Sequence, residues 1–401
     1  MRTRFTWMLG VAVLISIAVL VACSTTYSSS NNGLVVVSTQ GNPDMDTFNL
    51  DLVNGGVAQN TTRPPTNGQP TAVVLDPTGT FTYVMITQSS AVNDSVTGIE
   101  TFPVASDGRL GSGTTTTLKG GVAPVSMIID SAGKFLFVAD STPPAVSVLA
   151  IGSSGGLTEV SGSPFAVTEL PGGATRNAIP SPSALAVTST VYPSAFAVCS
   201  GSVPPTTENL YVADLANYAV LNYSVSSAGA LTLVSETATG SNPSGVTVDP
   251  CNRFVYVSNS QPDNTVSAYT VCRVVSLPSC PDANDSLLPV SGSPFAVGNS
   301  PGALMMDAYA GFLYVLDRGQ NAISSFRVST STGSLTVLSP TPVTTNSFPT
   351  SMAIRSDDSW MFVTNLNSAN LSEYAITPAT GTLTPQPTVE TDNFPWGVAV
   401  K

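Results

Sequence analysis

Few side chains in this chain are suited to hydrolytic chemistry, because none of its 401 residues is a histidine. A serine nucleophile in a G-x-S-x-G segment needs a strand-to-helix elbow and a histidine base. The segment Gly152-Ser153-Ser154-Gly155-Gly156 fits the pattern formally, but its glycines are typical of a hairpin turn. The sequence therefore predicts a turn at 152–156, and we expect no catalytic set of this kind.

Carboxylate and amide side chains recur at one position of a repeated pattern. An aromatic-rich apolar segment ends in Asp or Asn five times, at Asp140, Asp214, Asn259, Asp317 and Asn365. If these are corresponding strand ends, their oxygens would surround a common axis and could bind a cation or a polyol. The alternative is that each side chain accepts backbone N–H groups of the following turn. The free exchange of Asp for Asn favours turn capping.

Two basic residues are candidates for binding an anion on the same face. Arg318 directly follows Asp317, and Arg176 lies in a long segment at 169–179. The alternative for each is a surface ion pair. The acidic segments at 44–46 and 282–285 lack the glycine and the spaced ligands of a calcium loop, so we expect neither a metal nor another cofactor.

These candidates are positioned by a repeated unit that is clearest at 242–271. Each copy has a proline, a short apolar strand, a turn, an aromatic-rich strand with two apolar faces, and a third alternating strand. A sheet that is apolar on both faces needs a neighbouring sheet on each side. The copies must therefore pack in a closed array. Their anchor prolines are Pro70, Pro124, Pro182, Pro243, Pro301, Pro349 and Pro395, about 54 residues apart.

The two ends of the chain complete each other. The last proline, Pro395, is followed by a single strand at 397–400, whereas the strands at 34–38 and 47–52 have no first strand before them. We therefore predict an all-β fold, a seven-bladed β-propeller of four-stranded antiparallel blades. The C-terminal strand would close the ring against the N-terminal strands, and 33–401 would form a single domain.

The N-terminus predicts a lipid anchor. Arg2 and Arg4 precede an apolar stretch at 5–22, and Leu20-Val21-Ala22-Cys23 resembles the bacterial lipobox. We expect a lipoprotein signal peptide at 1–22, lipidation of Cys23 and a flexible tether at 23–32. The protein would then lie outside the cytoplasm, bound to the cell envelope through its lipid. The alternative is an uncleaved anchor helix.

The charge of the chain makes one class of partner unfavourable. Without residues 1–22 the chain has 11 basic and 25 acidic residues, a net charge of −14, and no basic run. Such a protein binds nucleic acid poorly. We expect no nucleic acid partner and a monomer.

The strand endings resemble those of a known family. They read FVAD at 137–140, YVAD at 211–214, YVSN at 256–259, YVLD at 314–317 and FVTN at 362–365. With Asp-Pro-x-Gly at 76–79 and the x-Gly-x-Leu turns, they are similar to the YVTN repeat of lactonase-type seven-bladed propellers, which include 6-phosphogluconolactonase-like enzymes. The resemblance covers 34–401. It implies a lactone-hydrolysing site in the central channel that uses His, Arg and acidic residues.

The absence of histidine bears on the choice between a binding protein and an enzyme. Because no convergent reactive set is visible either, we expect a non-catalytic binding or protein-interaction scaffold. A small molecule, a glycan or a protein would bind at the channel face. The alternative, from the resemblance, is a lactonase that hydrolyses a sugar lactone in the central channel.

Four cysteines remain for disulfides in an oxidising compartment. They are Cys199, Cys251, Cys272 and Cys280, and they allow three pairings. Cys199 and Cys251 fall in equivalent turns of adjacent blades, which share one face of the ring. We favour Cys199–Cys251 with Cys272–Cys280, and a Cys251–Cys272 pairing is the alternative.

Overall fold

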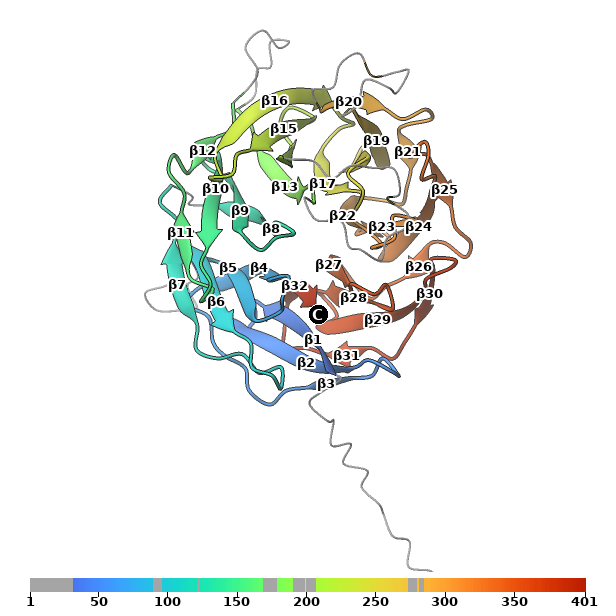
Figure 1. The fold of residues 1–401 in the computed structure, drawn as a ribbon. Coiled ribbons are helices and arrows are strands. Elements are labelled where there is room, and N and C mark those ends of the chain that lie inside the picture. The colour runs from blue at the N-terminus through green and yellow to red at the C-terminus, as the bar shows by residue number, and fades with distance from the viewer. Residues whose placement is uncertain are drawn as a thin grey trace, which may run out of the picture.

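The computed structural model describes residues 32–88, 96–120, 123–168, 179–189, 199, 207–272, 280 and 285–401. Its strands form seven antiparallel sheets arranged as blades around a central axis (Figure 1). The predicted all-β, seven-bladed propeller is confirmed. Among the described residues, no helix is long and apolar enough to cross a membrane.

Each blade runs outward from an innermost strand, which is named first here. Blade 1 contains β32 (Pro395–Val400), β1 (Asn32–Thr39), β2 (Asp44–Asp51) and β3 (Val57–Gln59). Blade 2 contains β4 (Gln69–Leu75), β5 (Phe81–Thr87), β6 (Gly98–Pro103) and β7 (Thr114–Thr117). Blade 3 contains β8 (Pro124–Ile129), β9 (Phe135–Ser141), β10 (Pro144–Ile151), β11 (Leu157–Glu159) and β12 (Phe165–Ala166).

Blades 4 to 7 repeat this order. Blade 4 contains β13 (Pro182–Val187), β14 (Glu208–Asp214), β15 (Ala219–Val225) and β16 (Leu231–Ala238). Blade 5 contains β17 (Pro243–Val248), β18 (Phe254–Asn259), β19 (Thr265–Cys272), β20 (Ser286–Pro289) and β21 (Phe295–Ala296). Blade 6 contains β22 (Pro301–Met306), β23 (Phe312–Asp317), β24 (Ala322–Val328), β25 (Leu335–Val337) and β26 (Val343–Thr344). Blade 7 contains β27 (Pro349–Ile354), β28 (Trp360–Asn365), β29 (Asn370–Thr377), β30 (Thr382–Pro385) and β31 (Val389–Glu390).

The ring closes where the two ends of the chain pair. Strand β32 runs antiparallel to β1, with Val398 opposite Val37 and Val400 opposite Val35. The side chains of Val35 and Val37 are fully buried in this seam. The predicted closure by the C-terminal strand is therefore confirmed.

Six of the innermost strands begin at the anchor proline itself, and β4 begins one residue before it, at Gln69. The C-terminal strand thus starts two residues earlier than the predicted position 397. A proline is tolerated as the first residue of a strand because it lacks a ladder N–H. In all seven blades the register between the innermost and second strands shifts at this point, as between Pro124 and Ser126. Such a bulge redirects the side chain of the residue that follows the proline.

Neighbouring blades are joined by an aromatic ring that lies beneath a glycine of the next blade's outer turn. Gly333 has a φ of 74°, and a Cβ there would lie 2.5 Å from Phe254 Cδ1. The same arrangement places Gly381 over Phe312 and Gly155 over Phe81. Only glycine fits, because the turn needs a positive φ and the ring fills the space of a side chain. Gly155 belongs to the 152–156 segment, which forms the predicted turn.

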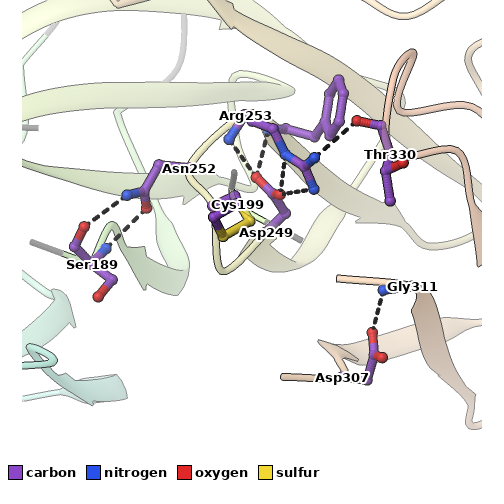
Figure 2. Close-up of a disulfide and its surroundings, with 10 residues drawn as sticks. Ser189, Cys199, Asp249, Asn252, Arg253, Asp307, Gly311 and Thr330 are labelled. Atoms are coloured by element: carbon purple, nitrogen blue, oxygen red, sulfur yellow. Dashed lines mark hydrogen bonds and ion pairs between the residues drawn. A yellow bond between two sulfur atoms is a disulfide. The ribbon is translucent and has the colours of Figure 1, made fainter. Parts of the chain in front are cut away.

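The seam between blades 4 and 5 is built differently. Asn209 occupies the β14 position at which other second strands carry the aromatic residue, and its Nδ2 donates to Asn222 Oδ1 at 3.0 Å. Asn222 Nδ2 donates in turn to the Asp285 carbonyl at 2.9 Å. Asn252 and Ser189 exchange two further hydrogen bonds between their blades (Figure 2).

Both favoured disulfides are present. Cys199 and Cys251 join blades 4 and 5 with their Cα atoms 5.3 Å apart, and Cys272 and Cys280 are 5.4 Å apart. The first disulfide lies beside Asp249, whose Oδ1 accepts the Phe254 N–H at 2.9 Å (Figure 2). Two disulfides are compatible with an extracytoplasmic protein. The predicted signal peptide, Cys23 and tether lie outside the described residues.

Candidate functional site

The innermost strands surround a cavity of about 480 Å³ on the propeller axis. Aliphatic side chains line most of its length, and Ser and Thr side chains gather where the strands begin. We call that end the mouth. Of the described residues that line the cavity, Arg318 alone carries a charge.

The bulges after the anchor prolines decide which side chains ring the mouth. In each blade the residue after the proline leaves the regular ladder, and in six blades that residue lines the cavity. The six are Thr71, Val125, Ser183, Ser244, Thr350 and Trp396. The remaining blade, blade 6, has Gly302 at this position. Blade 6 therefore leaves a gap in the ring.

Arg318 fills that gap. A Cβ at Gly302 would lie 2.5 Å from Arg318 Nε and 2.8 Å from its Cζ, so the guanidinium lies against the glycine backbone. Its Nη2 donates to the Thr350 carbonyl of blade 7 at 3.4 Å. Within the described chain its Nε has no hydrogen-bond partner and no carboxylate pairs with it.

An unpaired guanidinium at this depth is costly to the fold. Burial lowers the pKa of Arg318 from its ordinary value, and no acidic neighbour offsets that effect. A buried cation without a partner is normally avoided. Because the guanidinium lines the cavity without a carboxylate partner, an anion or a carbonyl oxygen that enters the mouth would find a cation there.

The hydroxyl groups of the ring bridge neighbouring blades. Ser183 Oγ donates to the Pro243 carbonyl and Ser244 Oγ donates to the Pro301 carbonyl, both at 2.7 Å. Thr350 Oγ1 donates to the Trp396 carbonyl at 2.8 Å. Each hydroxyl donates its hydrogen bond to the next blade and keeps a lone pair that can accept a hydrogen bond from a water molecule.

The repeated Asp and Asn residues lie inside the blades, and none of the five lines the cavity. Four of them are fully buried and bond a serine two residues into the third strand, because that serine is their diagonal neighbour across the hairpin. The pairs are Asp140–Ser147 (3.0 Å), Asn259–Ser267 (2.9 Å), Asp317–Ser324 (2.6 Å) and Asn365–Ser372 (2.9 Å). For these four, the turn-capping interpretation is wrong.

Asp214 is the exception that does cap a turn. Leu221 replaces the serine at the diagonal position in blade 4, so no hydroxyl is available across the hairpin. Asp214 Oδ1 instead accepts the Ser181 N–H at 2.8 Å and the Ala216 N–H at 3.1 Å. The difference between the blades therefore follows from one residue on the third strand.

Burial strongly raises the pKa of Asp140 and Asp317, the two aspartates that accept a serine hydrogen bond. It raises the pKa of Asp140 and of Asp317 to about 6 in each case, against the opposing effect of the serine hydrogen bond. In the described part of the chain, the second oxygen of each carboxylate has no hydrogen-bond partner. The neutral amides of Asn259 and Asn365 occupy the same place in blades 5 and 7. These sites thus favour an uncharged side chain.

Of the sequence candidates, the structure places only Arg318 in the cavity. Arg176, like Cys23, lies outside the described residues. The Cys199–Cys251 disulfide lies at the opposite end of the propeller, in the turn that joins β17 to β18. Sequence reasoning missed Gly302 and Trp396, although an alignment of the residues that follow the anchor prolines would have shown a glycine and a tryptophan among Ser, Thr and Val.

Comparisons with known proteins point to one group. Residues 284–401 match a sequence family described as a lactonase with a seven-bladed β-propeller. Similar solved structures include candidate 6-phosphogluconolactonases of Bacteroides fragilis (TM-score 0.71, 16% identity, 93% of this chain and 99% of that one) and Bacteroides uniformis (0.70, 15%, 92% and 100%). The periplasmic gluconolactonase of Pseudomonas aeruginosa is also similar (0.70, 19%, 92% and 99%). No curated protein sequence matches.

These findings correct one expectation. The non-catalytic scaffold is contradicted by the match to a lactonase family and by the lactonase-like solved structures, which favour the lactonase alternative. The scaffold interpretation rested on the missing histidine. An unpaired arginine in the channel can polarise a carbonyl group without one.

Proposed function

We propose that this chain, a lactonase-type seven-bladed propeller, hydrolyses a lactone in its central channel. The observation that carries the proposal is Arg318, a partly buried guanidinium at the mouth that has no carboxylate partner among the described residues. Arg318 lies against Gly302 and lines the cavity, so its guanidinium is close to whatever occupies that space. The match of residues 284–401 to a lactonase family supports the same reaction.

Arg318 would act on the carbonyl oxygen of the lactone. Water adds to the carbonyl carbon, and negative charge develops on that oxygen. A guanidinium already in place stabilises this charge without reorganising. The ring C–O bond then breaks, and the ring oxygen leaves as a hydroxyl group after taking up the proton that the attacking water releases through solvent. The product is an open-chain hydroxy acid, whose carboxylate Arg318 also suits.

The rest of the mouth would hold the substrate and the water. Ring hydroxyls such as Ser183 and Ser244 are fixed by their bonds to the next blade, so their free lone pairs point in set directions. Fixed acceptors orient a water molecule at low entropic cost. The aliphatic wall below them, which includes Val73 and Leu185, lowers the local dielectric and strengthens the interaction with Arg318.

Lactone turnover tests the proposal directly. Purified protein without residues 1–22 would be assayed with δ-gluconolactone and 6-phosphogluconolactone by acid release, with the uncatalysed rate subtracted. Replacing Arg318 by Met should lower kcat by roughly a hundredfold or more, the usual effect of removing an oxyanion donor. Arg318→Lys should retain part of the activity. Arg327→Gln is the control, because Arg327 lies over the Phe312 ring outside the channel. Equal turnover by Arg318→Met and the unaltered protein would refute this role.

We also propose that the propeller is held at the bacterial cell envelope by a lipid on Cys23 and works there as a monomer. The lipobox-like segment that ends at Cys23 and the two disulfides support this location. In a bacterial host, Cys23→Ser should move the protein from the membrane fraction to the soluble fraction and abolish incorporation of labelled palmitate. Unchanged fractionation and labelling would refute the anchor.

A further inference from the structure

Two phenylalanines at the mouth adopt a backbone conformation that disfavours them. Phe348 and Phe394 directly precede Pro349 and Pro395, the first residues of the innermost strands of blades 7 and 1. Their φ values are 58° and 59°. Their side chains are 40% and 51% exposed. Both therefore combine an unfavourable backbone conformation with an aromatic residue that is partly exposed to solvent.

The fold needs the conformation at this position but not the ring. Asn242 and Ser300 occupy the same position in blades 5 and 6 with φ of 51° each. In every case the backbone carbonyl accepts an N–H from beyond the second strand, as Phe348 does from Leu366. Asparagine tolerates positive φ far better than a bulky side chain does. Since burial does not offset the strain of the phenylalanines, folding does not explain their presence.

Hydrogen bonds link Arg318 to the strands that follow the two phenylalanines. Arg318 Nη2 donates to the carbonyl of Thr350, two residues after Phe348. Thr350 Oγ1 donates to the carbonyl of Trp396, two residues after Phe394. Blades 6, 7 and 1 thus form one sector of the mouth, in which Arg318 and Trp396 line the cavity and the exposed Phe348 and Phe394 precede the innermost strands. We call it the aromatic sector. The corresponding residues of blades 2 to 5 are Gln69, Ala123, Ser181 and Asn242.

We propose that the aromatic sector binds an apolar tail on the substrate, so that this protein prefers alkyl-substituted lactones, and their hydroxy acids, to small sugar lactones. The inference rests on the proposed function. Arg318 takes the lactone carbonyl or the product carboxylate, and the phenyl rings lie along the tail as it leaves the channel. Phe rings have no polar atom to bond sugar hydroxyls, which favours an alkyl chain.

The length of the tail is the measurable variable. The substrates are δ-hexalactone, δ-octalactone, δ-decalactone and δ-dodecalactone, and kcat/KM is measured for each. We expect kcat/KM to rise about two- to fourfold per methylene group until the tail passes the rings, fourfold corresponding to about 0.8 kcal/mol. Sodium hexanoate, octanoate and decanoate, measured by calorimetry, give a second readout that does not need turnover.

The variant Phe348→Asn/Phe394→Asn separates binding from folding. It installs the side chain that blade 5 already uses, so its Tm should be unchanged or slightly higher while the dependence on tail length disappears. Tyr218→Asn is the matched control. Tyr218 has a φ of 53° and is 46% exposed on the same face, but it belongs to blade 4 across the ring (Figure 1). Its replacement should leave the dependence intact.

The outcomes distinguish this inference from the proposed function. Lactone hydrolysis that is independent of tail length, or that keeps its dependence in the double variant, refutes the aromatic sector and leaves the lactonase proposal standing. Alkanoate binding that strengthens with length and is lost in the double variant, without any lactone turnover, supports the sector and refutes the lactonase. A drop in Tm of the double variant by several degrees shows that the rings stabilise the fold, which overturns the argument.

Discussion

Replacing Asp317 by Asn should stabilise the protein at neutral pH. Burial raises the pKa of this carboxyl from 3.8 to about 6, so the folded protein resists ionising it. A difference of about two pKa units, at about 1.36 kcal/mol per unit, makes the folded state about 3 kcal/mol less stable at pH 7. Asn259 shows that an amide fits the equivalent site and donates to the same serine position.

The sign of the pH dependence makes this prediction specific. Below about pH 4 the carboxyl is protonated in both states, so the substitution should change stability little. As pH rises from about 4 to about 6, the unfolded chain ionises while the folded chain keeps its proton, and wild-type stability falls. The advantage of Asp317→Asn should therefore appear across this interval and stay constant above it. Urea unfolding at pH 4, 5, 6, 7 and 8 measures the difference.

Asp214→Asn is the control for the same chemical change. Asp214 Oδ1 accepts two backbone N–H groups and its Oδ2 accepts the Asn217 amide at 2.7 Å, so an NH₂ group would face a donor. This variant should be less stable than wild type at pH 7. An Asp317→Asn protein that is less stable than wild type at pH 7, or whose gain is the same at every pH, would refute the reasoning.

The remaining predictions concern the two disulfides and one buried carboxyl group. Replacing Cys199 and Cys251 by Ser should lower the free energy of unfolding by about 4 kcal/mol, since they close a 52-residue loop, against about 2.5 kcal/mol for Cys272 and Cys280, which are 8 residues apart. Urea unfolding of both double variants tests the order, which reversed values would contradict. Burial raises the pKa of Glu373, on β29, to about 7. Glu373→Gln should therefore raise the free energy of unfolding by up to about 3 kcal/mol above pH 8 and change it little at pH 4. An increase at pH 4 as large as that at pH 8 would disprove this.

The architecture could be predicted from the sequence because it depends on local and repeated patterns. Strands such as Phe254–Asn259 are apolar on both faces, which requires a neighbouring sheet on each side. The unpaired first strand after Pro395 and the strands near the N-terminus fix the closure. The positions of Cys199 and Cys251 in equivalent turns were enough to favour their pairing.

The site was decided by tertiary structure, because its geometry depends on where single side chains point. Asp317 and Arg318 are adjacent in sequence, yet one lies inside a blade against Ser324 and the other lies in the channel over Gly302. Register shifts after the anchor prolines and the absence of a side chain at Gly302 cause this separation. An alternating pattern of apolar and polar residues shows neither feature. A bulge forms only when two strands pair, and the space over Gly302 forms only when the blades pack together.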